Sequence, residues 1–278
     1  MRWIAIGLWS AGLVLPAVAQ TSFPMITHTT PVAVQRGTTA EVIVEGKMNF
    51  AGAYSMLIAG NGVTAEAIPD PKAKPAKSPA ATPTATSAKF RVKVAADAPL
   101  GVREYRVGTA QGVSSLGQLI VVSDPVVSEG KGINEPSKAQ EVSIPVVISG
   151  RIETAENRDY YKFTARAGEI ITLEVYCARI QDKIHDLQKH ADPLIRLMDQ
   201  HGREVAASDD SYFADPLLSY KIPADGEYLV EIRDAVYSGD PRWVYAMAIT
   251  NQPYATHAFP LAANPGQSVD LIPVGSAK

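Results

Sequence analysis

One short stretch, SDDSYFADP at residues 208–216, combines three carboxylates with two aromatic rings. Asp209, Asp210 and Asp215 supply oxygen atoms of the kind that hard cations such as calcium prefer. Tyr212 and Phe213 supply large rings of the kind that dominate the binding energy at interfaces. Two interpretations stay open for this stretch. It is either a metal-shaped loop that presents two aromatic rings to a partner, or a solvated hairpin loop.

The sequence carries none of the short motifs that mark common catalytic sites. We find no G-x-S-x-G elbow, HExxH pair, phosphate-binding loop or paired-cysteine motif. His185 and His190 are five residues apart, so they do not share a helical face as zinc ligands four residues apart would. We therefore expect no enzyme. A dispersed Ser-His-Asp triad leaves an uncharacterised hydrolase as an alternative.

The chain has a single cysteine, Cys177, so no intramolecular disulfide can form. It alternates with Ile171, Leu173 and Val175 in EIITLEVYCA, which places all four side chains on one face of a strand. We interpret Cys177 as a core side chain rather than a reactive thiol. Stability must then come from packing, with a bound metal as a further source.

Residues 1–19 have the pattern of a secretory signal peptide. Arg2 gives the positive start, an apolar stretch follows, and Ala17-Val18-Ala19 fits the cleavage site. The apolar stretch is shorter than the roughly 20 residues that span a bilayer. We expect a secreted or cell-surface bacterial protein. Its formal net charge of −3 argues against nucleic acid or an anionic membrane as the main partner.

The elements that must position these residues are strands. Twenty Gly and twenty Pro, with short β-branched runs between them, predict an all-β protein of two β-sandwich domains. The first covers 22–124 and is immunoglobulin-like (Ig-like), with alternating runs such as TTAEVIVEG and KFRVKVAA. Asn61-Gly62 predicts a hairpin within it. Residues 69–88 hold five prolines and are interpreted as an extended Pro/Ala-rich loop.

A polar linker covers 125–133, and the second domain covers 134–250. RDYYKFTA and EIITLEVYCA predict strands, with Tyr161 and Phe163 facing the core. Residues 179–190, RIQDKIHDLQKH, have helical spacing and predict one short helix. Turns at 200–202 and at Asp225-Gly226 predict two hairpins. We expect a jelly-roll-like sandwich.

Residues 134–250 resemble the bacterial pre-peptidase C-terminal domain, which is similar to the collagen-binding domains of secreted collagenases. The resemblance rests on segments in the expected order: GRIETAENRDYYKFTARAGE, DPLIRLMDQHGREVAASDD, GEYLVEIRD and VYAMAI. It implies a non-catalytic β-sandwich, of a kind appended to exported peptidases, that binds substrate or matrix or assists secretion. Residues 22–124 are only generally similar to bacterial Ig-like or IPT/TIG modules.

The resemblance also implies a calcium site. In collagenase-type relatives, calcium is held by a Glu-X-Glu-Pro-Asn segment of the linker and by the acidic turn before the Asp-Tyr-Phe strand. Carried over one by one, the ligand positions fall on Glu135, Ser137, Asn157 and Asp159. This sequence departs from the pattern, because Ile133 replaces the first Glu and Lys138 adds a positive charge. We expect a calcium site that is weak or empty, and no other cofactor.

The beginning and the end of the chain repeat each other. Residues 24–49 align with 253–278 without a gap, at a constant offset of 229 that also matches His28 with His257. We expect 253–278 to be the first strand of a repeated Ig-like module, truncated, or else a free tail. Because each His precedes a Pro closely, we expect a structural turn or an inter-domain contact there. Two generic strand openings that happen to agree are the alternative.

These observations favour a secreted, non-catalytic binding or accessory protein. Its partner would be an extracellular protein or polysaccharide, together with a peptidase domain in a longer parent chain. The alternative from another class is a structural Ig-like spacer or adhesion protein at the cell surface, with no ligand of its own.

Overall fold

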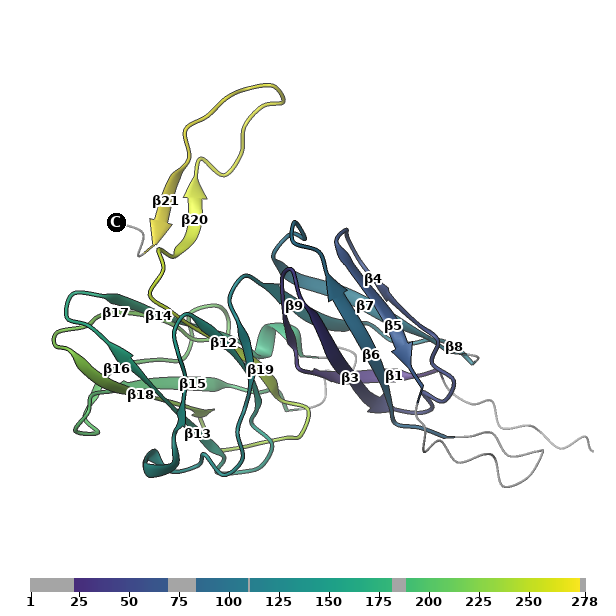
Figure 1. Ribbon diagram of the computed structural model, residues 1–278, viewed down its shortest axis with the longest axis horizontal. Helices are drawn as coiled ribbons and strands as arrows, with labels where there is room; N and C mark the ends of the chain where they lie inside the picture. The colour runs from purple at the N-terminus through teal and green to yellow at the C-terminus, as the bar shows by residue number, and fades with distance from the viewer. Residues whose placement is uncertain (1–22, 70–83, 110, 182–188, 276–278) are drawn as a thin grey trace, which may run out of the picture.

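The computed structural model describes residues 23–69, 84–109, 111–181 and 189–275. Strands dominate these ranges, so the predicted all-β sandwich fold is confirmed (Figure 1). Within them no helix is long and apolar enough to cross a lipid bilayer. The predicted signal peptide and most of the predicted Pro/Ala-rich loop fall outside the described residues.

The first sandwich consists of two sheets packed face to face, in which every strand pair except β2–β9 is antiparallel. One sheet has the order β1-β3-β6-β5, made by Met25–Thr30, Thr39–Lys47, Ser87–Val94 and Val63–Ile68. The other has the order β2-β9-β7-β4, made by Ala33–Gln35, Gly117–Val122, Gly101–Thr109 and Ser55–Ile58, with β8 (Gly112–Val113) beside β7. Alternation fills the core, because Val42 and Val44 on β3 face Phe90 and Val92 on β6 and all four are buried.

The second sandwich packs two five-stranded sheets. One has the order β10-β12-β19-β14-β17, made by Val126–Ser128, Val146–Arg151, Val244–Thr250, Ile170–Tyr176 and Leu217–Lys221. The other has the order β11-β13-β18-β15-β16, made by Gln140–Glu141, Arg158–Ala165, Gly226–Asp234, Pro193–Met198 and Glu204–Ser208. The predicted core face of β14 is confirmed, since Ile171, Leu173, Val175 and the free thiol of Cys177 are all fully buried.

Two predicted hairpins are wrong. The Asn61-Gly62 turn joins β4 to β5, but β4 pairs with β7 and β5 pairs with β6 in the opposite sheet. The Asp225-Gly226 turn likewise joins β17, which pairs with β14, to β18, which pairs with β13 and β15. A tight turn reverses the chain in either case, and it does not decide whether the next strand stays in the same sheet. The hairpin at 200–202 is as predicted, between β15 and β16.

The helix predicted over 179–190 lies mostly outside the described residues. Its start is described as a short 3-10 turn, η2 (Ala178–Ile180), which is preceded by Cys177. A second 3-10 turn, η1 (Pro136–Lys138), follows the linker.

The two sandwiches touch through a small apolar cluster. The cluster joins Val32, Ala33 and Ile120 of the first sandwich to Val147, Ile180, Val244 and Ala246 of the second. Polar contacts surround it. The amide of Val32 donates to Ser149 Oγ at 3.0 Å, and Arg151 Nη2 donates to Thr30 Oγ1 at 3.0 Å and lies 3.4 Å from Glu45 Oε2. His28 Nε2 lies 2.7 Å from the same Glu45 oxygen, so His28 sits at the contact between the sandwiches.

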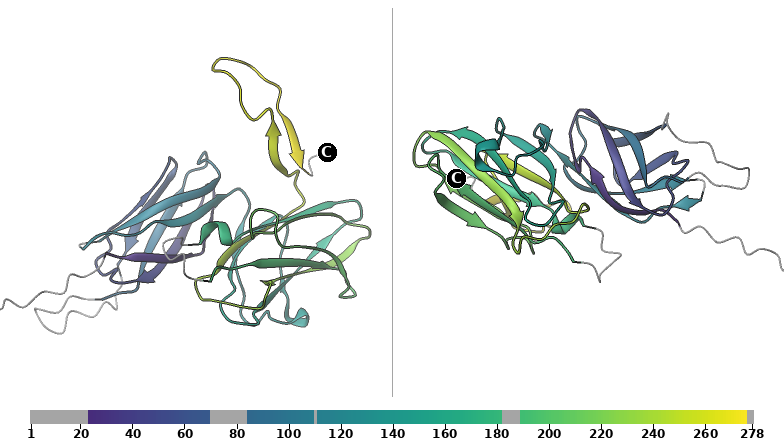
Figure 2. Two further views of the ribbon diagram at one scale, coloured as in Figure 1. Left: turned by 180° about the vertical axis from the view of Figure 1, so that it is seen from behind. Right: turned by 90° about the horizontal axis from the view of Figure 1, so that it is seen from below.

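The last described residues form a separate hairpin. β20 (Ala255–Phe259) and β21 (Ile272–Gly275) pair only with each other and project away from both sandwiches (Figures 1 and 2). Neither strand contributes a residue to the hydrophobic clusters of the two sandwiches.

Candidate functional site

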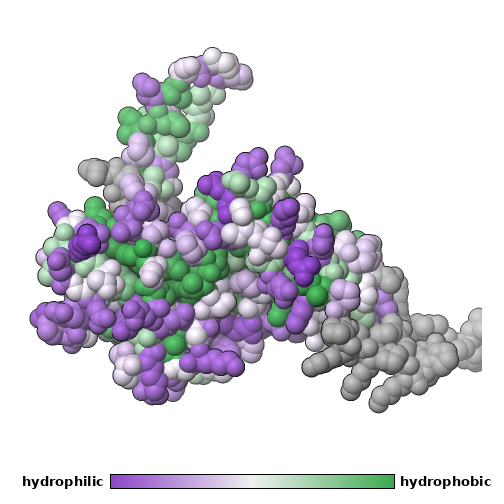
Figure 3. All heavy atoms as spheres, viewed as in Figure 1, coloured by the Kyte–Doolittle hydropathy of each residue, from purple (hydrophilic) through white to green (hydrophobic). Residues whose placement is uncertain are grey.

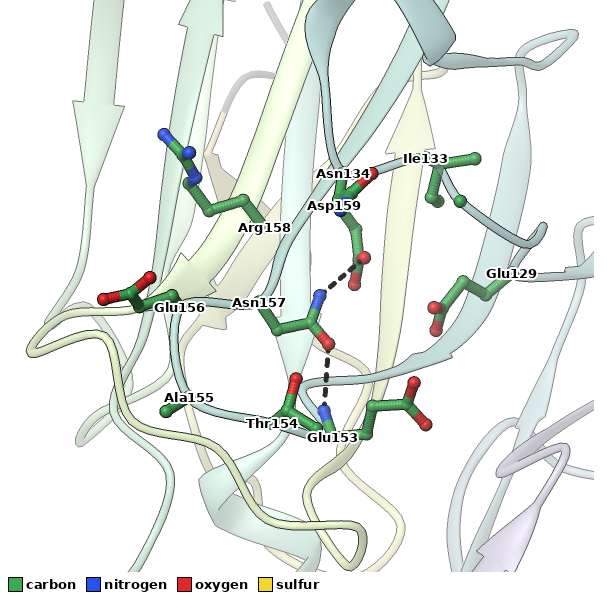
Figure 4. A pocket seen from close by; sticks show the side chains of 11 residues that line it. Glu129, Ile133, Asn134, Glu153, Thr154, Ala155, Glu156, Asn157, Arg158 and Asp159 are labelled. Atoms are coloured by element: carbon green, nitrogen blue, oxygen red, sulfur yellow. Dashed lines mark hydrogen bonds between the residues drawn. The ribbon is translucent and has the colours of Figure 1, made fainter.

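A pocket of about 500 Å³ opens at one end of the second sandwich. The segment that follows β10 forms one wall, and the turn between β12 and β13 forms the other (Figure 4). β10 itself lies within the predicted linker of residues 125–133, so part of that linker is a strand of the second sandwich. The polar residues that line it are Glu129, Asn134, Glu153, Thr154, Glu156, Asn157, Arg158 and Asp159. In Figure 4 the carboxylates of Glu129, Glu153 and Asp159 surround the hollow, whereas Glu156 and Arg158 point away from it.

Glu129 is held at the pocket by the edge of β12. Its Oε2 accepts a 2.7 Å hydrogen bond from the amide of Arg151, and its own amide donates to the carbonyl of Ser149 at 3.0 Å. Gly150 lies between these two residues, and a Cβ atom there would stand 2.8 Å from Glu129 Oε2 and 2.3 Å from the ring of Tyr245. The glycine is therefore what lets the carboxylate and the ring approach the strand.

Asp159 lies at the start of β13 and is only 2% exposed. Its Oδ1 accepts a 2.8 Å hydrogen bond from Asn157 Nδ2, and its Oδ2 accepts a 3.0 Å bond from Tyr245 Oη. Tyr161 Oη lies 2.6 Å from Tyr245 Oη and extends this buried chain into the core. Asn157 Oδ1 in turn accepts from the amide of Glu153 at 3.1 Å, so Asn157 orients Asp159 (Figure 4).

Both carboxylates have raised pKa values, and burial is the main cause in each. Burial raises the pKa of Glu129 to about 8, and the negative charge of Asp159 adds to the effect. Burial also raises the pKa of Asp159 to about 6, against the lowering effect of its Asn157 and Tyr245 hydrogen bonds. Two neighbouring carboxylates that are shielded from water favour holding a proton or a cation.

The ligand atoms that the lining residues offer suit a hard cation. Glu129 and Asp159 offer carboxylate oxygens, and none of the lining residues is His or Cys. Calcium accepts carboxylate, carbonyl and water oxygens in a flexible shell, whereas zinc prefers His and Cys. Across the described part of the chain, no three Asp, Glu, His or Cys side chains come together as a metal-binding group. Backbone and water oxygens would therefore have to complete any shell here.

The structure places two of the four predicted calcium ligands at this pocket. Asn157 and Asp159 line it, whereas Glu135 and Ser137 do not. Glu135 is turned aside by η1, and its carboxylate lies 3.0 Å from Lys138 Nζ at the surface. Ile133, at the position of the family's first Glu, is buried in the core. The sequence analysis missed Glu129, whose only signal was its place in the polar linker six residues before Glu135.

The second predicted site, the loop of residues 209–215, is anchored by Asp215. This carboxylate is fully buried and accepts hydrogen bonds from the amides of Cys177, Ala178 and Arg179 at 3.1, 2.7 and 3.1 Å. Arg179 Nε adds a fourth bond at 2.8 Å. Asp215 therefore holds the loop to η2, and its oxygens are engaged inside the protein.

The tip of the loop carries the exposed ring of Phe213. Its side chain is 87% exposed, and its backbone is left-handed with φ +63°. Tyr212 beside it is bridged to Asp215 through the backbone, and the Arg179 guanidinium lies 4.8 Å from its ring centroid. The same guanidinium lies 3.9 Å from the Tyr176 ring. Asp209 and Asp210 are exposed on the approach to the tip.

The comparisons with known proteins include one curated relative and several solved structures. No family model matches the chain. A probable subtilase-type serine protease of Deinococcus radiodurans is 30% identical over 74 residues, which are 27% of this chain and 9% of that protein. The chain thus spans about a tenth of the length of this curated relative.

Among solved structures, the chain is similar to the pre-peptidase C-terminal domain of collagenase from Bacillus anthracis. The identity is 13%, the TM-score is 0.33, and the match covers 42% of this chain and 99% of that domain. This is the resemblance that the sequence predicted. The secreted serine protease VesC from Vibrio cholerae is similar at 8% identity and a TM-score of 0.28, over 78% of this chain and 48% of that one.

Proposed function

We propose that this chain is a non-catalytic accessory module of an exported protein, of the kind attached to secreted peptidases. Its second sandwich holds an extracellular protein or polysaccharide through the 209–215 loop, and calcium at the Glu129–Asp159 pocket stabilises that sandwich. The sequence similarity to a short part of a much longer subtilase-type protease supports an appended role.

One observation carries the binding proposal: an almost fully exposed phenylalanine on a firmly anchored loop. A solvated connection gains nothing from an exposed Phe ring, and left-handed backbone is unfavourable for a bulky residue. The four hydrogen bonds to Asp215 and the stacking of Arg179 keep the tip in place. A preformed aromatic contact loses little entropy on binding, which is how aromatic anchors at interfaces gain affinity.

Retention of the full chain on immobilised collagen-like, glycan and cell-wall materials tests this proposal. The wild-type chain should be retained by one of them, and Phe213→Ala should elute early. Tyr54→Ala is the matched control, because Tyr54 is also an exposed aromatic residue, at 68%, but belongs to the first sandwich. A chain that nothing retains would instead be the structural spacer.

Calcium binding is tested by thermal unfolding with and without the ion. At the affinity of extracellular modules, with a Kd of about 10⁻⁴ to 10⁻³ M, millimolar calcium adds about 1 kcal/mol. That corresponds to a rise of several degrees in the Tm of a domain of this size. Glu129→Gln and Asp159→Asn should each abolish the shift, whereas Glu135→Gln should retain it. Equal shifts in all three variants would place the ion elsewhere.

A further inference from the structure

The C-terminal hairpin is apolar and uncovered within the described residues. Leu261 is 82% exposed, and Leu271 and Ile272 are each 62% exposed. Figure 3 shows hydrophobic residues gathered on this projection, away from the two sandwiches. Exposed apolar strands with free edges are templates for pairing with another strand.

The hairpin reproduces the pairing of β1 with β3 residue by residue. At the offset of 229, the pair His28↔Glu45 becomes His257↔Val274, and both ladders have a register shift at the preceding step. The same hydrogen bond closes each pair: Thr27 Oγ1 donates to Glu45 O at 3.2 Å, and Thr256 Oγ1 donates to Val274 O at 3.0 Å. The repeat is therefore one of structure as well as of sequence.

The main difference between the two hairpins lies at the start of their second strand. β3 runs from Thr39 to Lys47, and its pairing with β1 begins at Ile43, so its first four residues pair only with β6. β21 begins at Ile272, the counterpart of Ile43. Residues 268–271, the counterparts of the four that need β6, are not in a strand. β21 therefore begins only where β20 can pair with it, and residues 268–271 have no β6-like partner strand among the described residues.

We propose that β21 and residues 268–271 form a docking edge for a strand of the β6 type, supplied by the remaining strands of an Ig-like sandwich. Such a strand alternates apolar and cationic residues, as Phe90, Arg91, Val92 and Lys93 do in β6.

The side chains of the C-terminal hairpin suit a β6-type strand as their partner. Asp270 takes the place of Glu41, whose carboxylate lies 3.9 Å from Arg91 across the ladder. Leu271 takes the place of Val42, which is fully buried opposite Phe90. An incoming β6-type strand would pair its cation with Asp270 and bury Leu271, while backbone hydrogen bonds extend the sheet.

The docking edge is tested by fusing the other strands of the first sandwich to the C-terminus of the full chain. Lys278 corresponds to Asn49, so residues 50–124 of the same chain are appended after Lys278. Amide hydrogen exchange at residues 268–271 is then compared with that of the unmodified chain. We expect it to slow by at least about tenfold, because these amides gain strand partners and a covered face.

Two variants of the fusion separate specific docking from mere attachment. Leu271→Asp should restore fast exchange. Leu261→Ser should leave it slow, because its counterpart Val32 packs on the contact between the two sandwiches rather than in the core of the first. Fast exchange at 268–271 in a soluble fusion overturns the proposal.

A shorter fusion covers the case in which the long one does not fold. Residues 87–94 are attached after Lys278 through a flexible Gly-Ser linker, which raises their effective concentration to about the millimolar range. Absence of slowing there also overturns the proposal. Slowing in the unmodified chain that grows with its concentration would identify a second copy as the occupant, and that would contradict the proposed partner.

Discussion

At the scale of single residues, the pocket contains one buried acid, Asp159, and one partly buried acid, Glu129, and the pKa of each is raised. Burial, with the charge of Asp159 adding to it, raises the pKa of Glu129 to about 8, and burial raises that of Asp159 to about 6. An acid whose pKa is higher in the folded state binds more protons folded than unfolded. Between about pH 4 and pH 8, these two groups therefore make the calcium-free protein less stable as the pH rises.

Glu129→Gln should remove most of this pH dependence. In a calcium chelator, the Tm of the wild-type second sandwich should fall from pH 5 to pH 8 more steeply than that of the variant. With millimolar calcium the wild-type Tm should recover most at pH 8, because only the deprotonated acids bind the ion. Parallel Tm curves for both proteins in the chelator would contradict the assigned environment of Glu129.

The site contacts of Glu129 and Asp215 could not be predicted from the sequence. Asn157 and Asp159 were predicted at the pocket because their motif is local. Glu129 is held there by hydrogen bonds to Ser149 and to Arg151, the latter 22 residues along the chain. The role of Asp215 was equally hidden, because its four bonds lead to residues 36 to 38 positions away. Such partners depend on tertiary folding and leave no spacing signal in the chain.

At the scale of elements, alternation predicted which side chains each strand buries, and turn chemistry did not predict strand partners. Val42, Phe90, Leu173 and Tyr161 all face a core as their patterns indicate. Asn61-Gly62 gave a turn, but the chain crosses there from one sheet to the other. Sheet choice depends on the whole sandwich, so a two-residue motif cannot specify it.

Gly150→Ala tests how tightly β12 is packed at the pocket. The added Cβ would stand 2.3 Å from the Tyr245 ring, and we expect a loss of about 1–3 kcal/mol in the free energy of unfolding. Gly226→Ala in β18 is the control, because its nearest neighbour would be a flexible Gln200 oxygen at 3.4 Å. Urea denaturation measures both. Equal stabilities would mean that the Tyr245 ring moves aside freely.

At the scale of the whole molecule, His28 connects the two sandwiches. Its ring contacts Glu45, and Glu45 in turn contacts Arg151 of the second sandwich; Asp240 also acts on His28 electrostatically. Burial lowers the pKa of His28, and the charge of Arg151 lowers it further against the effect of Glu45. A histidine with a lowered pKa binds fewer protons in the folded state, so the contact loses stability as the pH falls through about 6.5.

We therefore expect the two sandwiches to separate more freely under mild acid. Small-angle X-ray scattering should give a larger radius of gyration at pH 5 than at pH 7.5. His28→Gln should reduce the difference, because a neutral side chain keeps a hydrogen bond to Glu45 at both pH values. An unchanged radius in the wild-type chain would contradict a titrating contact.

The central claim is that the second sandwich binds its partner through the tip of the 209–215 loop. The most direct measurement is the Kd of the full chain for whichever material retains it, compared between wild type, Phe213→Ala and Tyr54→Ala. A buried aromatic anchor contributes about 2 kcal/mol or more, so Phe213→Ala should weaken binding at least about 30-fold while Tyr54→Ala leaves the Kd unchanged. Equal Kd values for wild type and Phe213→Ala would contradict the claim.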